Sequence, residues 1–275
     1  MPDPEKPRSN LTLRLLTAAV TVPLLLYSLL GGPLWLFPLL TEIVCALGAH
    51  ELFTMVSPKH PFERAWGVLM SVVLCAQIAG LLDPTWTVPM LVSIVCGGLM
   101  ISLIQVEPMA EASPRAAWAL AGPLYLGGLF GTIALLFRSA HGGGWVLLAM
   151  LYAFWSDTAG YFVGRAYGKR PLYSAVSPKK TIEGSIGGVL GALVGGLLAH
   201  FWFLPTLPLL DAILLSIAGA LIGQVGDLCE SLIKRSCGVK DSGKLLPGHG
   251  GILDRVDALL FTAAVVYLYT ICRGA

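Results

Sequence analysis

The side chains best suited to chemistry gather between residues 227 and 257 of this 275-residue chain. Carboxylates stand at both ends of the stretch, lysines and arginines lie between them, and a Pro-Gly-His-Gly-Gly turn follows most of the cations. Carboxylates together with substrate phosphates are the usual ligands of Mg²⁺, and cations together with turn amides bind phosphate. The stretch therefore predicts a site for a polyphosphate and a divalent metal. Its candidate residues are Asp227, Glu230, Ser231, Lys234, Arg235, Lys240, Lys244, His249, Gly250, Gly251, Asp254, Arg255 and Asp257.

Helical spacing sorts these carboxylates onto two helices. Asp227, Ser231 and Lys234 share one helical face, and Asp254 and Asp257 share the first turn of the next helix. Carboxylates that converge from two helices repel one another unless a cation lies between them, so we expect Mg²⁺ there. The alternative for Asp254 and Asp257 is favourable placement at a helix N-terminus, which is worth only tenths of a kcal/mol.

A second basic region precedes the first by about fifty residues. Lys179 and Lys180 lie in a Ser-Pro-Lys-Lys-Thr segment just ahead of a predicted helix, an arrangement that suits phosphate. Upstream, Asp157, Tyr161 and Arg165 share a helical face, and a carboxylate inside a membrane span is a functional candidate. The alternative is that this basic loop is only a topology signal.

The composition indicates a membrane protein. The chain is 56% hydrophobic and 12% charged, whereas soluble domains carry roughly 25% charged residues. Apolar stretches of about 20 residues, the length that crosses a bilayer, recur along it. The sequence therefore predicts an all-α, polytopic integral membrane protein. A net charge of +2 is too small to indicate a nucleic-acid partner.

The apolar segments predict about nine transmembrane helices. If the N-terminus is cytoplasmic, every Lys and Arg except Arg138 and Arg273 falls on the cytoplasmic side, as the positive-inside rule requires, and the C-terminus lies outside. We expect a cytoplasmic tail at 1–10, about five helices over 11–140, and a catalytic half over 141–275 with four helices and two basic loops. The expected spans are about 11–30, 34–56, 65–82, 86–104, 116–137, 145–163, 184–204, 210–235 and 255–271.

Several other residues receive weaker assignments. Glu42, His50 and Glu51 face either a polar cavity or the membrane interface, and we assign them no catalytic role. Asp211 is expected to be solvated at the outer end of its span. We expect His249 to hydrogen-bond phosphate or base rather than bind metal, because no second histidine lies nearby. The glycines of the seventh span favour close helix packing in lipid, with a flexible gate or substrate passage as the alternative.

One long pattern and three shorter motifs are similar to a known family. The pattern Ser231-x-x-Lys234-Arg235, then Lys240-Asp241, then His249-Gly-Gly-x-x-Asp-Arg-x-Asp257 resembles the signature of phosphatidate cytidylyltransferases, or CDP-diacylglycerol synthases. The Ser156-Asp157-Thr158, Gly164-Arg165 and Ser177-to-Gly188 motifs resemble that family too. The matched part covers about 155–257, and the N-terminal half matches only as hydrophobic spans. The resemblance implies a Mg²⁺-dependent, often dimeric membrane enzyme that converts CTP and phosphatidate into CDP-diacylglycerol and pyrophosphate.

The resemblance also implies roles for individual residues. The expected metal ligands are Asp227, Asp254 and Asp257. The residues expected to act in catalysis are Asp227, Lys234, Arg235, Asp254 and Arg255, of which the cations, with Lys240, would hold the triphosphate. The residues expected to bind substrates are Lys179, Lys180, Ser231, Lys240, His249, Gly250 and Gly251. The sequence leaves open whether a monovalent cation joins the Mg²⁺.

Three other functional classes fit the sequence less well. A secondary transporter could use Asp157 and Asp227 as ion sites, but the inverted repeat expected of one is missing from the sequence. A CDP-alcohol phosphotransferase would carry an Asp-Gly-x-x-Ala-Arg motif, which is also missing. The sequence contains no P-loop, so pumping driven by nucleotide hydrolysis is disfavoured. The compact chain favours a bacterial inner membrane, with the active site facing the cytoplasm.

Overall fold

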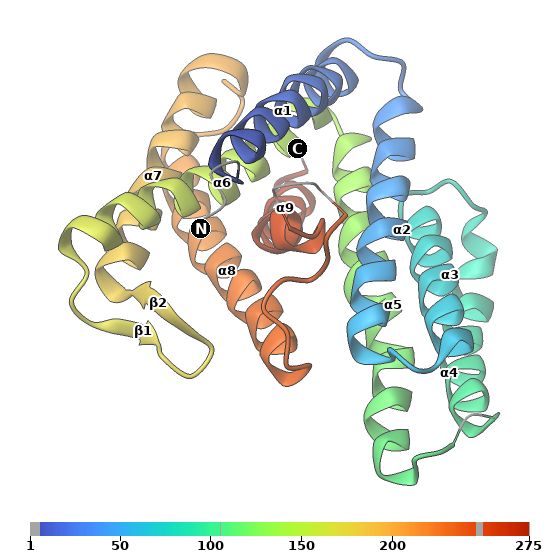
Figure 1. The fold of residues 1–275 in the computed structure, drawn as a ribbon. Coiled ribbons are helices and arrows are strands. Elements are labelled where there is room, and N and C mark those ends of the chain that lie inside the picture. Colours follow the sequence, from blue (N-terminus) through green and yellow to red (C-terminus); the bar gives the residue numbers. More distant parts are fainter. Residues whose placement is uncertain (1–5, 105, 246–249, 275) are drawn as a thin grey trace.

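The computed structural model describes residues 6–104, 106–245 and 250–274, most of which are helical (Figure 1). An antiparallel hairpin of strands β1 (Pro171–Tyr173) and β2 (Ser177–Thr181) interrupts the helices. The α-helices of the described chain are α1 (Lys6–Leu30), α2 (Leu36–Val56), α3 (Pro61–Ile78), α4 (Thr87–Ile104), α5 (Met109–Phe137), α6 (Gly142–Tyr167), α7 (Ile182–Leu198), α8 (Leu209–Ser236) and α9 (Leu253–Arg273). A 3₁₀ turn, η1 (Pro84–Trp86), precedes α4, and a π-helical turn, η2 (Ala199–Phe203), continues α7.

Each expected span overlaps one of these helices. Within the described residues, seven helices are long and apolar enough to cross a membrane: α2, α4 with η1, α5, α6, α7 with η2, α8 and α9. The apolar part of α1, Thr17–Leu30, is shorter, and α3 does not meet the same measure of length and apolarity. The all-α, membrane-spanning class is therefore confirmed. The count of nine crossings and the orientation of the termini stay predictions.

Two local features differ from the sequence-based expectation. Helix α1 begins at Lys6, inside the segment 1–10 expected to be a tail. Pro7 does not prevent this, because proline lacks only an N–H that has no partner in the first helical turn. The basic loop before α7 also forms the β1–β2 hairpin, which runs directly into the helix through its N-cap, Thr181.

Helix α9 is the central element of the fold (Figure 1). On one side it packs against α6 and α8, which together with α7 form one group of helices. On the other side it packs against α5 and α2, which with α3 and α4 form the second group. The last helix in the sequence therefore joins the two groups, and its N-terminal end meets residues from both.

Helices α6 and α7 approach closely through their glycines. A Cβ on Gly184 would lie 2.9 Å from the backbone oxygen of Gly160, and one on Gly191 would lie 2.6 Å from the backbone oxygen of Trp155. These distances leave no room for a side chain, so the glycines act as a packing face, as the sequence indicated. This contact fixes α6 against the hairpin end of α7.

The expectation that Asp211 is solvated was wrong. Its side chain is 7% exposed, accepts a hydrogen bond of 2.8 Å from the Tyr269 hydroxyl and pairs with Arg273 at 2.8 Å. Helices α8 and α9 run antiparallel, so the end of α9 covers the beginning of α8. The sequence separation of about sixty residues hid this pairing.

The α6–α7 contact predicts the effect of a single added methyl group. Gly191→Ala should lower the melting temperature of the detergent-purified protein, because overpacking of this kind costs about 1–3 kcal/mol. Gly128→Ala is the matched control, since a Cβ there meets nothing within 4 Å. Equal melting temperatures for both variants would show that α6 and α7 separate without cost.

Candidate active site

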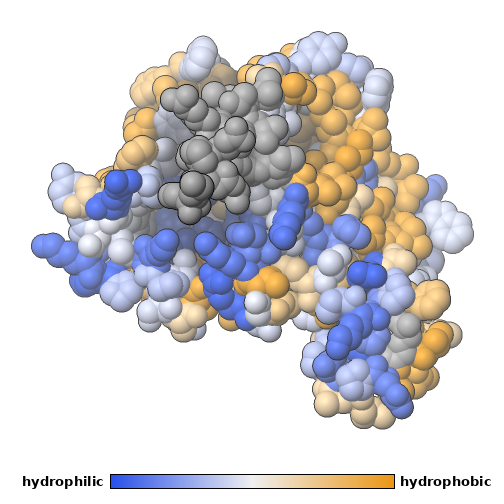
Figure 2. Space-filling view, in the orientation of Figure 1, coloured by the Kyte–Doolittle hydropathy of each residue, from blue (hydrophilic) through white to orange (hydrophobic). Residues whose placement is uncertain are grey.

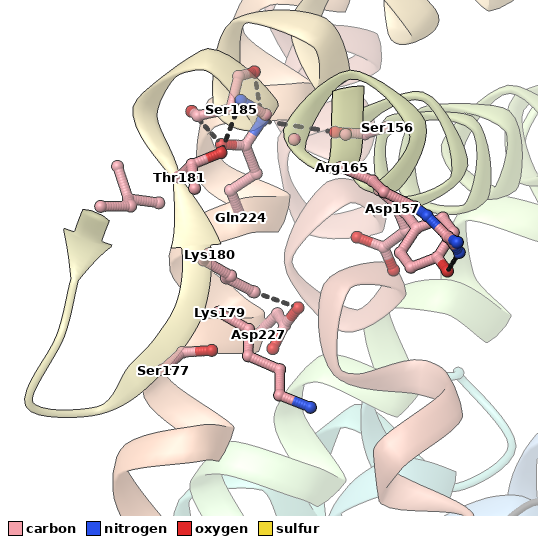
Figure 3. A pocket seen from close by; sticks show the side chains of 15 residues that line it. Ser156, Asp157, Arg165, Ser177, Lys179, Lys180, Thr181, Ser185, Gln224 and Asp227 are labelled. Atoms are coloured by element: carbon pink, nitrogen blue, oxygen red, sulfur yellow. Dashed lines mark hydrogen bonds and ion pairs between the residues drawn. The ribbon is translucent and has the colours of Figure 1, made fainter. Parts of the chain in front are cut away.

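A cavity of about 450 Å³ opens between α6, β2, α7 and α8 (Figure 3). Helix α6 contributes Asp157 and Arg165, β2 contributes Lys179 and Lys180, and α8 contributes Asp227. The cavity therefore brings together the lysines of one predicted basic region, Asp227 of the other, and the intramembrane carboxylate Asp157. Its lining of cations and carboxylates suits a phosphorylated ligand.

The floor of this cavity is a polar network that the sequence did not reveal. The Gln224 amide donates 3.1 Å to the Ser185 backbone oxygen and 3.4 Å to the Ser156 hydroxyl, and it accepts a hydrogen bond from the Ser185 hydroxyl. These three residues come from α8, α7 and α6 (Figure 3). The network holds the three helices in register beneath the charged side chains.

Lys180 and Asp227 form an ion pair across the cavity. The Ser231 hydroxyl, one turn further along α8, donates to the other Asp227 oxygen at 3.4 Å. Lys179 lines the same cavity beside this pair (Figure 3). The predicted substrate-binding residues Lys179, Lys180 and Ser231 therefore all lie around Asp227.

Lys234 and Asp254 tie α8 to the start of α9. The Lys234 ammonium lies 2.6 Å from one Asp254 oxygen and also pairs with Glu230. The other Asp254 oxygen accepts three hydrogen bonds of 3.0 Å, from the Ser242 amide, the Ser242 hydroxyl and the Gly251 amide. Asp254 thus closes the loop between α8 and α9, and all its contacts are internal.

Glu51, which the sequence left without a role, supports this loop from the N-terminal half. Its carboxylate is 5% exposed and accepts hydrogen bonds of 3.0 Å from each of the Ile252 and Leu253 amides and of 2.9 Å from the Ser242 hydroxyl. Ile252, at the N-cap of α9, has no capping side chain of its own, so Glu51 supplies the cap from a distant helix. The only sign of this role in the sequence was the presence of an acidic residue within the last six positions of an apolar helix.

Two glycines leave the space that Glu51 occupies. A Cβ on Gly243 would lie 2.4 Å from a Glu51 oxygen, and one on Gly251 would lie 2.6 Å from the other oxygen. Gly250 has a backbone φ of +83°, a conformation that L side chains rarely adopt. Gly243, Gly250 and Gly251 thus allow the chain to fold closely over a buried carboxylate. His249 lies outside the described residues.

Other predicted residues lie around this centre with different partners. Asp257 is 8% exposed and lies within electrostatic range of Asp227, Glu230 and Asp157. Arg255 lies within electrostatic range of Asp157. Arg235 points away, toward backbone oxygens of the hairpin turn and of Val239, the latter at 3.3 Å. Lys240 is exposed on the loop after α8.

The carboxylates are suited to a metal by type but are occupied by lysines in this arrangement. Among the described residues, no group of three or more His, Cys, Asp or Glu side chains is arranged to hold a metal ion. Carboxylates outnumber the cations near them, however, and oxygen ligands of this kind are those that Mg²⁺ prefers. The carboxylates are Asp157, Asp227, Glu230, Asp254 and Asp257, and the cations are Lys180, Lys234 and Arg255.

The cap of α9 predicts a large effect of removing Glu51. Glu51→Ala should strongly lower the melting temperature of the detergent-purified protein, because the Ile252 and Leu253 amides lose their buried acceptor at about 1–3 kcal/mol each, whereas the Ser242 hydroxyl can still donate to Asp254. His50→Ala, which alters an exposed neighbour, is the control and should melt like the wild type. A Glu51→Ala protein as stable as the His50 variant would contradict the cap.

Comparison with known proteins gives a consistent result. A family model described as the cytidylyltransferase family matches residues 12–272. The chain is 37% identical to the phosphatidate cytidylyltransferase of Brucella suis over 95% of this chain and 93% of that protein. It is 34% identical to the phosphatidate cytidylyltransferase of Synechocystis sp. over 94% of this chain and 96% of that protein. It is 31% identical to the phosphatidate cytidylyltransferase of Staphylococcus saprophyticus over 94% of this chain and 98% of that protein. A family match of this extent shows that the protein belongs to the cytidylyltransferase family.

Proposed function

We propose that the protein transfers the cytidylyl group of CTP to phosphatidate, forming CDP-diacylglycerol and pyrophosphate. The observation that carries the proposal is the meeting of Lys179 and Lys180 with Asp227 in one cavity, in a chain whose relatives are named for this activity. The predicted alternative, a transporter that uses Asp157 and Asp227, gains no support from the family match.

The arrangement supports an in-line displacement at the α-phosphorus of CTP. A phosphate oxygen of phosphatidate forms the new O–P bond, the bond between the α-phosphorus and its bridging oxygen breaks, and pyrophosphate leaves. Phosphatidate attacks as an anion, so no general base is required. Lys179 and Lys180 would hold its phosphate, and Arg255 with Lys240 would bind the triphosphate and offset the charge of the transition state. Lys180 must exchange its present partner, Asp227, for phosphate.

Lys234 and Asp254 fit a positioning role better than direct contact with substrate. Their mutual ion pair, and the three hydrogen bonds to the second Asp254 oxygen, hold α8, α9 and the loop between them in place. Loss of either side chain would therefore displace Arg255 and Asp257, the next residues on α9. Arg235, predicted to bind triphosphate, would have to turn away from the hairpin to do so.

Mg²⁺, when bound, would neutralise phosphate charge and orient the α-phosphoryl group for displacement. We assign Asp227 and Asp257 as its first ligands, because each has fewer internal partners than Asp254. Asp227 pairs with one lysine and accepts one long hydrogen bond, and Asp257 accepts a hydrogen bond of 2.7 Å from the Ala258 amide. Asp254, the third predicted ligand, could join them only by releasing Lys234 or the loop amides.

The surface supports a cytoplasmic active site in a multi-pass membrane protein. Figure 2 shows hydrophilic residues gathered along the lower side of the molecule, over the hairpin and the C-terminal end of α8 and around the start of α5, whereas hydrophobic residues cover the flank above. The positive-inside rule assigns that hydrophilic side to the cytoplasm. CTP would enter from there, and phosphatidate from the surrounding leaflet. The inner-membrane location and the homodimer that the resemblance implies are part of this proposal.

The role assigned to Asp227 predicts a loss of activity linked to Mg²⁺. Asp227→Asn should lower the transfer of labelled cytidine from CTP into extractable lipid by about 100-fold or more and should raise the Mg²⁺ concentration needed for half-maximal rate. Asp211→Asn, the same change sixteen residues earlier on α8, is the control and should retain activity. Full activity in the Asp227 variant would remove this residue from the site, and an unchanged Mg²⁺ dependence would remove it from the ligands.

The role assigned to Lys179 predicts a different kinetic change. Lys179→Ala should raise the KM for phosphatidate by about tenfold or more with a smaller change in the KM for CTP, because it removes a charged donor to the lipid phosphate. Lys169→Ala, a change of an exposed lysine ahead of the same hairpin, should leave both constants unchanged. A selective rise in the KM for CTP would instead place Lys179 at the nucleotide.

A further inference from the structure

A second cavity, of about 580 Å³, lies between α3, η1 and α4. Helix α3 begins beside the end of α2 that carries Glu51 and runs about 27 Å away from it. Residues from the far half of α3 line this cavity. It therefore lies at the end of the helices opposite the candidate active site. Its wall is largely apolar, with Met70, Val73, Leu82 and Met90 among its residues. Trp86 also lines it and is 61% exposed, as is typical of aromatic residues at a membrane–water interface.

A buried amide on this wall has an unused acceptor. Gln77 is 7% exposed, and its nitrogen donates to the Asp83 backbone oxygen at 3.2 Å and to the Thr87 hydroxyl at 3.0 Å. A backbone oxygen can only accept, so the atom facing it must be the amide nitrogen, which fixes the orientation of the group. The Gln77 carbonyl oxygen is buried and has no partner among the described residues. A ligand that donates a hydrogen bond would satisfy it.

The charge of the cavity is negative. Asp83 lines it and is the only ionisable residue that does so among those described. One of its oxygens accepts hydrogen bonds from the amide and the hydroxyl of Thr85, at 2.8 and 2.7 Å. The other has no partner among the described residues. A cationic donor would thus be favoured here over an anionic one.

A positive charge is fixed close by, just outside the cavity. The Arg138 guanidinium donates to the backbone oxygens of Ala79 and Gly80, at 2.9 and 3.1 Å, and so is held against the turn that continues into Leu81 and Leu82 of the cavity wall. The guanidinium remains exposed and can bind an anion with its other nitrogens. Asp83 on the cavity wall and Arg138 on the turn that leads into that wall therefore carry opposite charges at the same end of α3.

We propose that this cavity binds a phospholipid with an ethanolamine headgroup. Asp83 and the Gln77 carbonyl hold the primary ammonium, Arg138 holds the phosphate, and the apolar wall covers part of an acyl chain. A choline headgroup has no N–H to donate to Gln77, a glycerol headgroup has no positive charge for Asp83, and a serine headgroup adds a carboxylate that Asp83 repels. This lipid site is separate from the proposed reaction and does not depend on it.

Native mass spectrometry of the full-length protein in detergent tests the proposal. Phosphatidylethanolamine, phosphatidylcholine and phosphatidylglycerol with identical acyl chains are offered at equal concentration, and the bound lipids are counted. The wild type should retain phosphatidylethanolamine at least about fivefold more than either other lipid, as expected for charge-assisted hydrogen bonds. Equal retention, or a preference for another headgroup, overturns the proposal.

Variants locate the preference. Asp83→Asn removes the charge but keeps the cap of η1, because asparagine caps as well as aspartate. Asp83→Asn and Gln77→Leu should both reduce retention of phosphatidylethanolamine to the level of phosphatidylcholine. Glu111→Gln, which removes an exposed carboxylate outside the cavity, should keep the preference. If either variant folds and keeps the wild-type preference for phosphatidylethanolamine, the assignment of that residue is overturned. If Gln77→Leu does not fold, the result for Asp83→Asn alone tests the proposal.

Discussion

The buried carboxylate of Glu51 is the contact on which the candidate active site depends. It lies in an apolar helix and accepts hydrogen bonds from the first amides of α9 and from Ser242, about two hundred residues later in the chain. An isolated carboxylate in such a place would be very costly, and the unpaired amides of a buried helix end would be costly as well. Here the amides at the start of α9 donate to the carboxylate, so neither group is left without a hydrogen-bond partner. The N-terminal helices are therefore part of the site's construction, although the motifs lie in the C-terminal half.

Around this cap, three carboxylates of the site are held in internal ion pairs. Lys180 pairs with Asp227, and Lys234 pairs with both Glu230 and Asp254. In a region of low dielectric such pairs are required, since a single unpaired charge costs several kcal/mol. The two lysines differ in their surroundings: Lys180 lines the open cavity, whereas Lys234 is 9% exposed. The first pair is thus placed to exchange partners with a phosphate, and the second to hold two helices together.

The sequence predicted what depends on local pattern. Apolar runs located the helices with errors of up to seven residues at their ends, the largest at the start of α5, and helical spacing placed Asp227, Ser231 and Lys234 on one face. It could not predict pairings across long separations, such as Glu51 with Leu253 or Asp211 with Tyr269, because no local signal links the partners. The hairpin was missed as well, because its strands are short and contain Pro and Lys, which are poor strand formers. The residues around the cavity were recognised by charge type, but their partners required the fold.

The central position of α9 has a consequence for biosynthesis. A ribosome delivers this helix only after both groups of helices that it joins have been synthesised. Until then Glu51 and Lys234 lack their partners on α9 and its preceding loop, and the nascent protein carries uncompensated charge at the membrane. The site can therefore assemble only once α9 has been synthesised. A truncated product lacking only this helix would keep most of its spans yet expose buried charges, a difference that a cellular quality-control protease could recognise.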